Sequence, residues 1–271
     1  MLVNFDVLED LYRRLNRRRY VHPDPLEFLY RYECPRDREI AALVASCLAY
    51  GRVKQILRSI SAVLDEMGPR PARYLVGAGP VRLRRAFAGF RHRFATGQHL
   101  AALLLAARKL TDAYGSLGDC FAAAVTSQDQ TVLPALKAFA AQLRAAADDG
   151  CGHLLPDPDR GSACKRLNLM LRWLVRQDEV DPGGWSGVPQ AKLIVPLDVH
   201  MFRTARALGA TGRNAADIRT ALEVTAAFRQ ISPDDPVRYD FALTRLGIRA
   251  DMDLSELLDR CNGGRRKICN D

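Results

Sequence analysis

The sequence lacks the features that mark several large classes of protein. It contains no run of about 18 apolar residues, so no membrane span is expected. The first residues, Met1–Asp6, have neither a basic start nor a long apolar run, and no signal peptide is expected there. Alternating apolar and polar positions, internal repeats and low-complexity tracts are also missing. These absences argue against a β-rich, repetitive or disordered protein.

The cysteines lack any pattern of a disulfide framework or a metal site. There are 7 of them, scattered along the chain, and no two form a CxxC pair. This usage indicates reduced thiols in a cytoplasmic protein. Cys261 and Cys269 lie near each other among basic residues, but a full set of metal ligands is missing, so neither a metal nor another cofactor is expected.

The chain does have enough apolar residues to form a core and an excess of positive charge. Its 271 residues are 48% hydrophobic, which is enough for one large domain or two intimately packed ones. The formal net charge of +9 favours a polyanionic partner such as nucleic acid. The alternative is a protein that is simply basic.

Apolar residues recur at helical spacing along most of the chain, which predicts an all-α fold. Only Leu193–Leu197 is a candidate for extended structure. We expect Trp173 in the core, and Trp185 as either a stacking platform or an anchor. The predicted helices cover residues 6–19, 37–49, 54–67, 81–93, 100–114, 133–147, 167–176, 214–230 (capped by Asn214) and 237–246, with Pro69 and Pro71 ending the segment at Met67.

Residues 155–165, LPDPDRGSACK, predict a tight turn that leads into a helix. Gly161 permits a close backbone approach, and Ser162 is a candidate helix cap. The free amides at such a helix start can bind a phosphate. Lys165 lies in the first helical turn, where it is either a nucleophile or a solvated surface lysine.

Residues 195–206, VPLDVHMFRTAR, place a carboxylate at a second helix start. Asp198 follows Pro196 and precedes the predicted helix, so its simplest role is an N-cap worth about 1 kcal/mol. The sequence separates Asp198 from Lys165 by a long interval, and spacing alone does not bring the two together.

These two segments resemble the helix-hairpin-helix DNA glycosylase superfamily. VPLDVHM is similar to the catalytic-aspartate segment of the eukaryotic 8-oxoguanine glycosylases, and Lys165 matches the superfamily's lysine. The hairpin is divergent, because Asp157–Gly161 replaces the usual Gly-x-Gly turn, and the long lysine-to-aspartate interval is similar to the archaeal enzymes. The resemblance covers residues 37–248 in element order but is specific only in 155–175 and 193–209. The closely spaced cysteines of an iron–sulfur cluster are missing.

The resemblance implies a two-lobed helical protein, with residues 1–271 as a single domain and 154–209 as the hairpin and catalytic-aspartate segment. The implied protein is a cytoplasmic monomer of a divergent bacterial branch, associated with the nucleoid, that acts on double-stranded DNA containing a damaged base. Lys165 would attack the deoxyribose C1′ of a flipped nucleotide and form a Schiff base. An ionised Asp198 would stabilise the cationic sugar, and β-elimination would then cut the strand.

The resemblance also implies roles for the residues around this pair. Tyr50 is either a wedge inserted into the duplex or a tyrosine of the core. Phe241 either stacks on the purine or lies in the core. Asp240 either forms a hydrogen bond to the purine edge or has a structural role. The predicted DNA-binding residues are Gly161, Ser162, Cys164, Arg166, Arg172, Tyr50 and Arg52, with Arg160 adding charge, and the predicted base-pocket residues are Asp240, Phe241 and His200.

The leading hypothesis is therefore a DNA glycosylase with β-lyase activity on an oxidised purine, 8-oxoguanine first. One alternative is a non-enzymatic helix-hairpin-helix protein that binds DNA or RNA. Another is a helical interaction protein whose basic faces are only solvated. The interaction protein would show no salt-dependent binding to duplex DNA, whereas the glycosylase and the non-enzymatic binder would both bind DNA with an affinity that falls steeply with salt.

Overall fold

Helices form most of the protein, which confirms the all-α fold class. The computed structural model describes residues 5–148, 150–248 and 254–266. The α-helices are α1 (Phe5–Leu15), α2 (Pro35–Leu48), α3 (Val53–Met67), α4 (Pro71–Gly77), α5 (Pro80–Ala86), α6 (Gly97–Tyr114), α7 (Leu117–Ala122), α8 (Leu133–Ala146), α9 (Lys165–Val175), α10 (Val199–Ala207), α11 (Ile218–Arg229), α12 (Asp240–Ile248) and α13 (Leu254–Arg266). Short 3-10 helices cover Arg18–Tyr20, Pro25–Arg31, Gly152–Leu154, Pro158–Arg160 and Gln190–Lys192.

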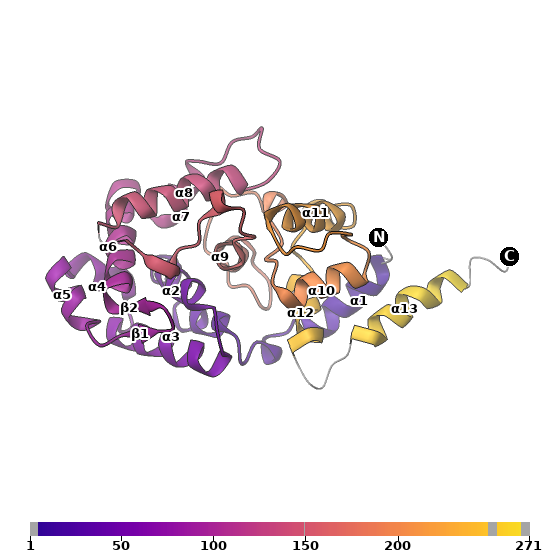
Figure 1. Cartoon of the computed structure of the whole chain (residues 1–271), viewed down its shortest axis with the longest axis horizontal. Helices are drawn as coiled ribbons and strands as arrows, with labels where there is room; N and C mark the ends of the chain where they lie inside the picture. The colour runs from indigo at the N-terminus through magenta and orange to yellow at the C-terminus, as the bar shows by residue number, and fades with distance from the viewer. Residues whose placement is uncertain (1–4, 149, 249–253, 267–271) are drawn as a thin grey trace.

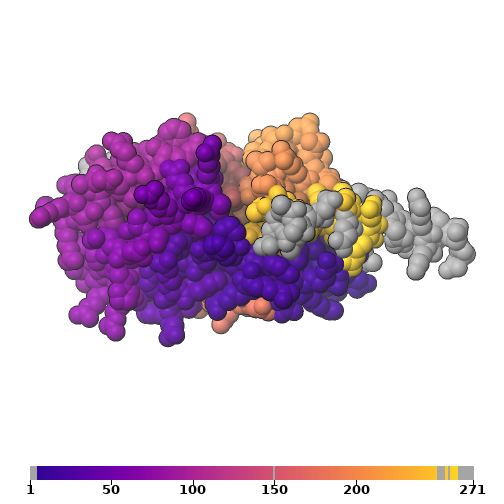
Figure 2. Space-filling model, turned by 90° about the horizontal axis from the view of Figure 1, so that it is seen from below, coloured from indigo at the N-terminus to yellow at the C-terminus, as the bar shows by residue number. Residues whose placement is uncertain are grey.

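The helices form two groups with α9 between them. Figure 1 shows α2 to α8 on one side, and α1 with α10 to α13 on the other. Helix α2 is buried on every face from Glu39 to Leu48 and packs against α9. An apolar surface all round a helix is typical of a central position. The face in Figure 2 shows the purple N-terminal segments and the orange α10–α11 region meeting at a hollow.

Several helices begin or end elsewhere than predicted, and the reasons are local. Pro71 starts α4 at its first turn, where proline costs nothing because that N–H has no helical partner. Asp217, not Asn214, caps α11 and accepts the amide of Thr220 at 2.9 Å. Helix α12 begins at Asp240 rather than Val237. Leu193–Leu197 forms no strand.

The predicted helix over residues 81–93 is wrong in its second half. Helix α5 ends at Ala86, and a short antiparallel hairpin of β1 (Arg91–His92) and β2 (Ala95–Thr96) follows. Thr96 then caps α6 through the amide of His99. The hairpin lies against α3.

The two tryptophans are both anchors in the interior. Trp173 is fully buried. The Trp185 indole donates to Glu39 Oε2 at 3.0 Å and its ring contacts Phe121 and Phe139. Trp185 is therefore not a stacking platform.

Candidate functional site

Lys165 and Asp198 meet in space. The Lys165 Nζ lies 3.0 Å from Asp198 Oδ2, with the lysine side chain 35% exposed and the aspartate 17% exposed. Helix α9 presents Lys165 at its first residue, and α10 begins directly after Asp198. The fold thus brings two helix starts together, and each contributes one charge to a half-open pair.

Asp198 is held by more than the lysine. Its Oδ1 accepts the backbone amide of Met201 at 2.8 Å, which is the predicted N-cap. Burial opposes ionisation, but the Lys165 charge, the Met201 amide and the nearby His200 outweigh it and lower the pKa of Asp198 below its usual range. The carboxylate is therefore ionised at neutral pH.

The pair opens into a cavity of about 230 Å³. Its wall carries Lys165, Asp198, His200 and Pro196. Its far side is formed by segments of both helix groups: Pro23, Asp24, Pro25, Ala49, Gly51, Val53, Ile56, Leu169, Arg172, Asp240, Thr244, Arg245 and Ile248. Because pockets for drug-sized ligands measure roughly 300–1,000 Å³, this cavity has room for a smaller, ring-sized group.

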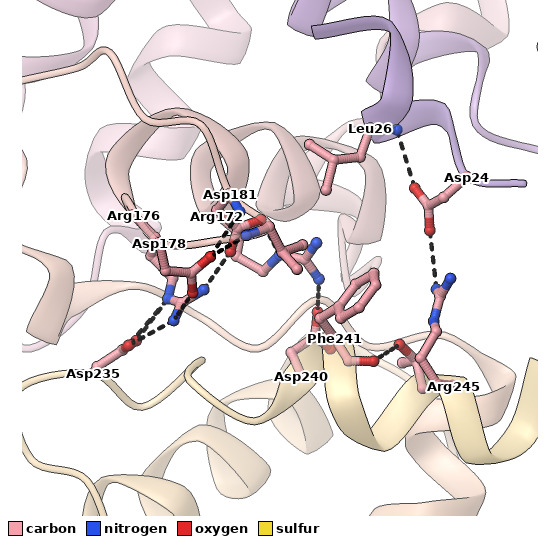
Figure 3. A network of polar contacts seen from close by, with 12 residues as sticks. Asp24, Leu26, Arg172, Arg176, Asp178, Asp181, Asp235, Asp240, Phe241 and Arg245 are labelled. Carbon is pink, nitrogen blue, oxygen red and sulfur yellow. Dashed lines mark hydrogen bonds and ion pairs between the residues drawn. The ribbon is translucent and has the colours of Figure 1, made fainter. Parts of the chain in front are cut away.

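Two lining residues of the cavity, Arg172 and Asp240, belong to a buried charge network (Figure 3). The Arg172 guanidinium pairs with Asp181 at 3.2 Å and with Asp240 Oδ2. Arg176, one turn on, pairs with Asp178, Asp181 and Asp235. Buried charges are tolerated only when paired, so these contacts fix α9 against the segments around it.

Asp240 still has one oxygen without a partner in the described part of the chain. Oδ2 is bound to Arg172, but Oδ1 is buried and accepts no hydrogen bond. Burial raises the pKa of Asp240 to about 6, although the pairing with Arg172 opposes the shift. A buried acceptor left open costs free energy, which makes Asp240 a candidate to bind a donor on a ligand in the cavity.

His200 also lines the cavity, as predicted. Its ring lies against Gly247 of α12, where a Cβ would come within 2.9 Å of His200 Nδ1. The glycine thus allows the imidazole to lie close to α12 at the cavity wall.

Three residues predicted to contact DNA or a base make their contacts inside the protein. Arg166 donates to the carbonyl oxygens of Cys47, Leu154 and His153. Arg172 is 3% exposed and belongs to the charge network. Phe241 is 1% exposed in the core, between Arg172 and Arg245.

Tyr50 is half-buried and makes its contacts inside the protein. Its hydroxyl donates to the backbone oxygen of His92 at 3.1 Å, and its ring packs edge-on against His92 at 4.7 Å. Arg166 covers the ring at 4.9 Å. Arg52, in the same loop, is exposed at the start of α3.

The turn before α9 differs from a helix-hairpin-helix. No α-helix lies between α8 and α9 in the described residues 150–164, where 3-10 turns cover Gly152–Leu154 and Pro158–Arg160. Gly161 is exposed with φ +76 and Ser162 is exposed beside it. Ser162 accepts the Cys164 amide at 3.2 Å and does not cap α9; the N-cap is the buried, left-handed Cys164 with φ 47. Cys164 is therefore shielded from a phosphate by burial.

Two residues of the site escaped the sequence reasoning. Arg245 of α12 pairs with Asp24 at 2.9 Å, and both line the cavity (Figure 3). Asp24 also caps the following turn through the amide of Leu26. Its position before a proline is the one signal that could have marked Asp24, because Asp-Pro is typical of a turn start.

The structure and the comparisons add four findings. Among the described residues, no group of three or more His, Cys, Asp or Glu side chains could hold a metal, and Cys269 lies outside them. No helix in the described ranges is both long and apolar enough to span a membrane. No curated protein and no solved structure matches the chain. Residues 24–249, which include the whole cavity lining except Pro23, match the family described as "Protein of unknown function (DUF2400)", and the chain belongs to this family.

Proposed function

We propose that this protein is a DNA glycosylase with β-lyase activity that removes an oxidised purine, 8-oxoguanine first, through a Schiff base on Lys165. The observation that carries the proposal is the 3.0 Å pair of Lys165 Nζ and Asp198 Oδ2 at the mouth of a ring-sized cavity. The substrate would be double-stranded DNA, which in a bacterial cell places the protein, as a monomer, at the nucleoid.

The chemistry uses the two groups in sequence. Lys165 gives up a proton, and its nitrogen bonds to C1′ of a flipped nucleotide while the bond from C1′ to the base breaks. The base leaves with the electron pair and takes a proton. Asp198, whose pKa is lowered, keeps its negative charge beside the positive sugar and lowers the barrier electrostatically. Ring opening gives the Schiff base, and loss of a C2′ proton then expels the 3′ phosphate.

The inner end of the cavity supports recognition of a base edge. Oxidation of a purine at C8 places a hydrogen on N7, so the lesion has a donor where the normal base has an acceptor. Asp240 lines the cavity, and its Oδ1 is a buried acceptor without a hydrogen-bond partner among the described residues. An acceptor there favours the oxidised ring over the normal one, because the normal ring would set two acceptors face to face.

Borohydride trapping on a duplex with one 8-oxoguanine tests the proposal. The wild-type protein is expected to form a covalent adduct and the Lys165→Ala variant none. Lys137→Ala is the matched control, because Lys137 is also a half-exposed lysine paired with an aspartate, Asp159 at 2.9 Å. An adduct that survives Lys165→Ala would contradict the proposal. DNA binding without any adduct, on this or other oxidised purines, would instead favour the non-enzymatic binder.

A further inference from the structure

The tip of the β1–β2 hairpin exposes an aromatic side chain. Phe94 is 62% exposed, and its ring lies 5.0 Å from the His153 ring and 5.5 Å from the Arg93 guanidinium. Arg93 has φ 54, a backbone conformation that non-glycine residues rarely adopt. The chain thus accepts local strain to form a tight tip that carries Arg93 and Phe94.

The tip is held in place from below. His92 is fully buried; its Nδ1 lies 2.9 Å from Ser59 Oγ and its Nε2 lies 3.0 Å from the Tyr50 carbonyl oxygen. Tyr50 returns a hydrogen bond to the His92 backbone. A side chain on a fixed support loses little conformational freedom when it binds, so Phe94 is prepared for contact.

The tip lies beside the cavity. A Cβ added to Gly51, which lines the cavity, would come within 2.9 Å of Arg93 Cδ. The ring of His153 contacts the ring of Phe94. The carbonyl oxygen of His153 accepts a hydrogen bond from the guanidinium of Arg166, the residue after Lys165. The hairpin tip, the cavity rim and the start of α9 therefore form one continuous surface.

A basic groove lies on the other side of the α3 start. It measures about 620 Å³ and is lined by Arg52, Lys54, Arg58 and Arg91, with Gln55, Ser59, Ala62, Gly89 and Phe90. None of the lining residues is acidic. None of these four cations forms an ion pair with a carboxylate in the part of the chain that the structure describes. Gly51 and Val53 face the cavity and Arg52 and Lys54 face the groove, so the first turn of α3 separates the two.

We propose that the hairpin tip and the basic groove form one binding surface for duplex DNA, in which Phe94 stacks on a base beside the nucleotide in the cavity and Arg52, Lys54, Arg58 and Arg91 bind backbone phosphates. The proposal rests on the proposed function for the identity of the ligand, DNA. Unpaired cations around a groove match a phosphate backbone, and an exposed aromatic ring beside a guanidinium matches an unstacked base.

Binding of a fluorescein-labelled duplex tests the surface, with and without a tetrahydrofuran abasic-site analogue, over a range of salt concentrations. Phe94→Ala is expected to weaken binding to the abasic duplex about 5- to 150-fold, the range for loss of one base–aromatic stack, with an unchanged salt slope. Phe94→Tyr is expected to restore affinity. Arg58→Ala is expected to weaken binding to both duplexes and to reduce the salt slope by about 1.

Two residues on another pocket serve as matched controls. Val76 is also 62% exposed and Arg73 is exposed beside it, so Val76→Ala and Arg73→Ala change the same properties elsewhere. The surface is overturned if Phe94→Ala and Arg58→Ala bind no more weakly than these controls. Borohydride trapping on Lys165 is a separate readout. If the surface variants lose binding but the wild-type protein is never trapped, the binding surface is supported and the proposed glycosylase is contradicted. If the wild-type protein is trapped but the surface variants bind normally, the glycosylase is supported and the binding surface is contradicted.

Discussion

At the residue scale, Asp198 serves two partners with its two oxygens. Oδ1 accepts the Met201 amide and so begins α10, and Oδ2 faces the Lys165 ammonium. Asparagine caps a helix about as well as aspartate but carries no charge. A single substitution can therefore separate the structural role of Asp198 from its electrostatic role.

Asp198→Asn is expected to lower the single-turnover rate of base excision by about 10²- to 10³-fold, the cost of removing one preorganised electrostatic group. The melting temperature is expected to change little, because the cap is retained. Asp198→Ala loses both roles and is expected to unfold more easily by about 1 kcal/mol. A wild-type rate in the asparagine variant would show that the charge is not used.

Asp240→Asn replaces a hydrogen-bond acceptor by a donor at the cavity lining. Arg172 requires an acceptor, so the amide oxygen is expected to turn toward Arg172 and the amide nitrogen toward the cavity. Excision of 8-oxoguanine is expected to fall sharply, while cleavage at an abasic site, which has no base to recognise, stays near the wild-type rate. Equal loss of both activities, with an unchanged melting temperature, would contradict a role in base recognition.

The two carboxylates also predict a pH dependence. The pKa of Asp240 is raised to about 6, so this group is charged above that pH and protonated below it, where its oxygen no longer serves as an open acceptor. The pKa of Asp198 is lowered, so this group stays ionised throughout that range. The ratio of base excision to abasic-site cleavage is expected to fall as the pH drops from 7 to 5. A constant ratio would argue that Asp240 does not read the base.

At the element scale, the hairpin depends on one close contact at the start of α6. A Cβ on Gly97 would lie 1.7 Å from the backbone oxygen of Phe87. Gly97→Ala is therefore expected to destabilise the protein by about 1–3 kcal/mol, the usual cost of overpacking. Gly77→Ala, at the end of α4 with nothing within 4 Å, is the control. Urea denaturation measures both, and equal midpoints would contradict the close contact.

The sequence predicted the long helices better than the irregular segments between them. The apolar spacing of α2, α6 and α8 is set by burial, and the helices predicted there are confirmed. The hairpin was missed because the helix of α5 was extended past Ala86, whereas β1 pairs there with β2 and packs against α3, a contact that depends on tertiary structure. Part of the site could be predicted, because residue type and local sequence identified Lys165 and Asp198 as candidates. The distance between these two side chains and the burial of Arg172 and Phe241 depend on tertiary packing, which the sequence does not show.

At the scale of the whole molecule, the charge network holds α9 between the two groups of helices. Arg176 is 2% exposed and pairs with three aspartates. Arg176→Ala leaves these carboxylates buried without their shared partner, so a loss of about 3–5 kcal/mol of stability is expected. Chemical denaturation checks this, with the exposed Arg73→Ala as control. A variant as stable as the control would show that water replaces the guanidinium.

The joining of two helix starts at Lys165 and Asp198 also has a consequence for the life of the chain. Each charge lies on its own segment, and the pair exists only once α9 and α10 have docked. A nascent or partly degraded chain therefore carries the amine but not its carboxylate. Under the proposed function, the reactive pair therefore assembles only with folding, and a broken copy of the protein would not carry out the proposed chemistry on DNA.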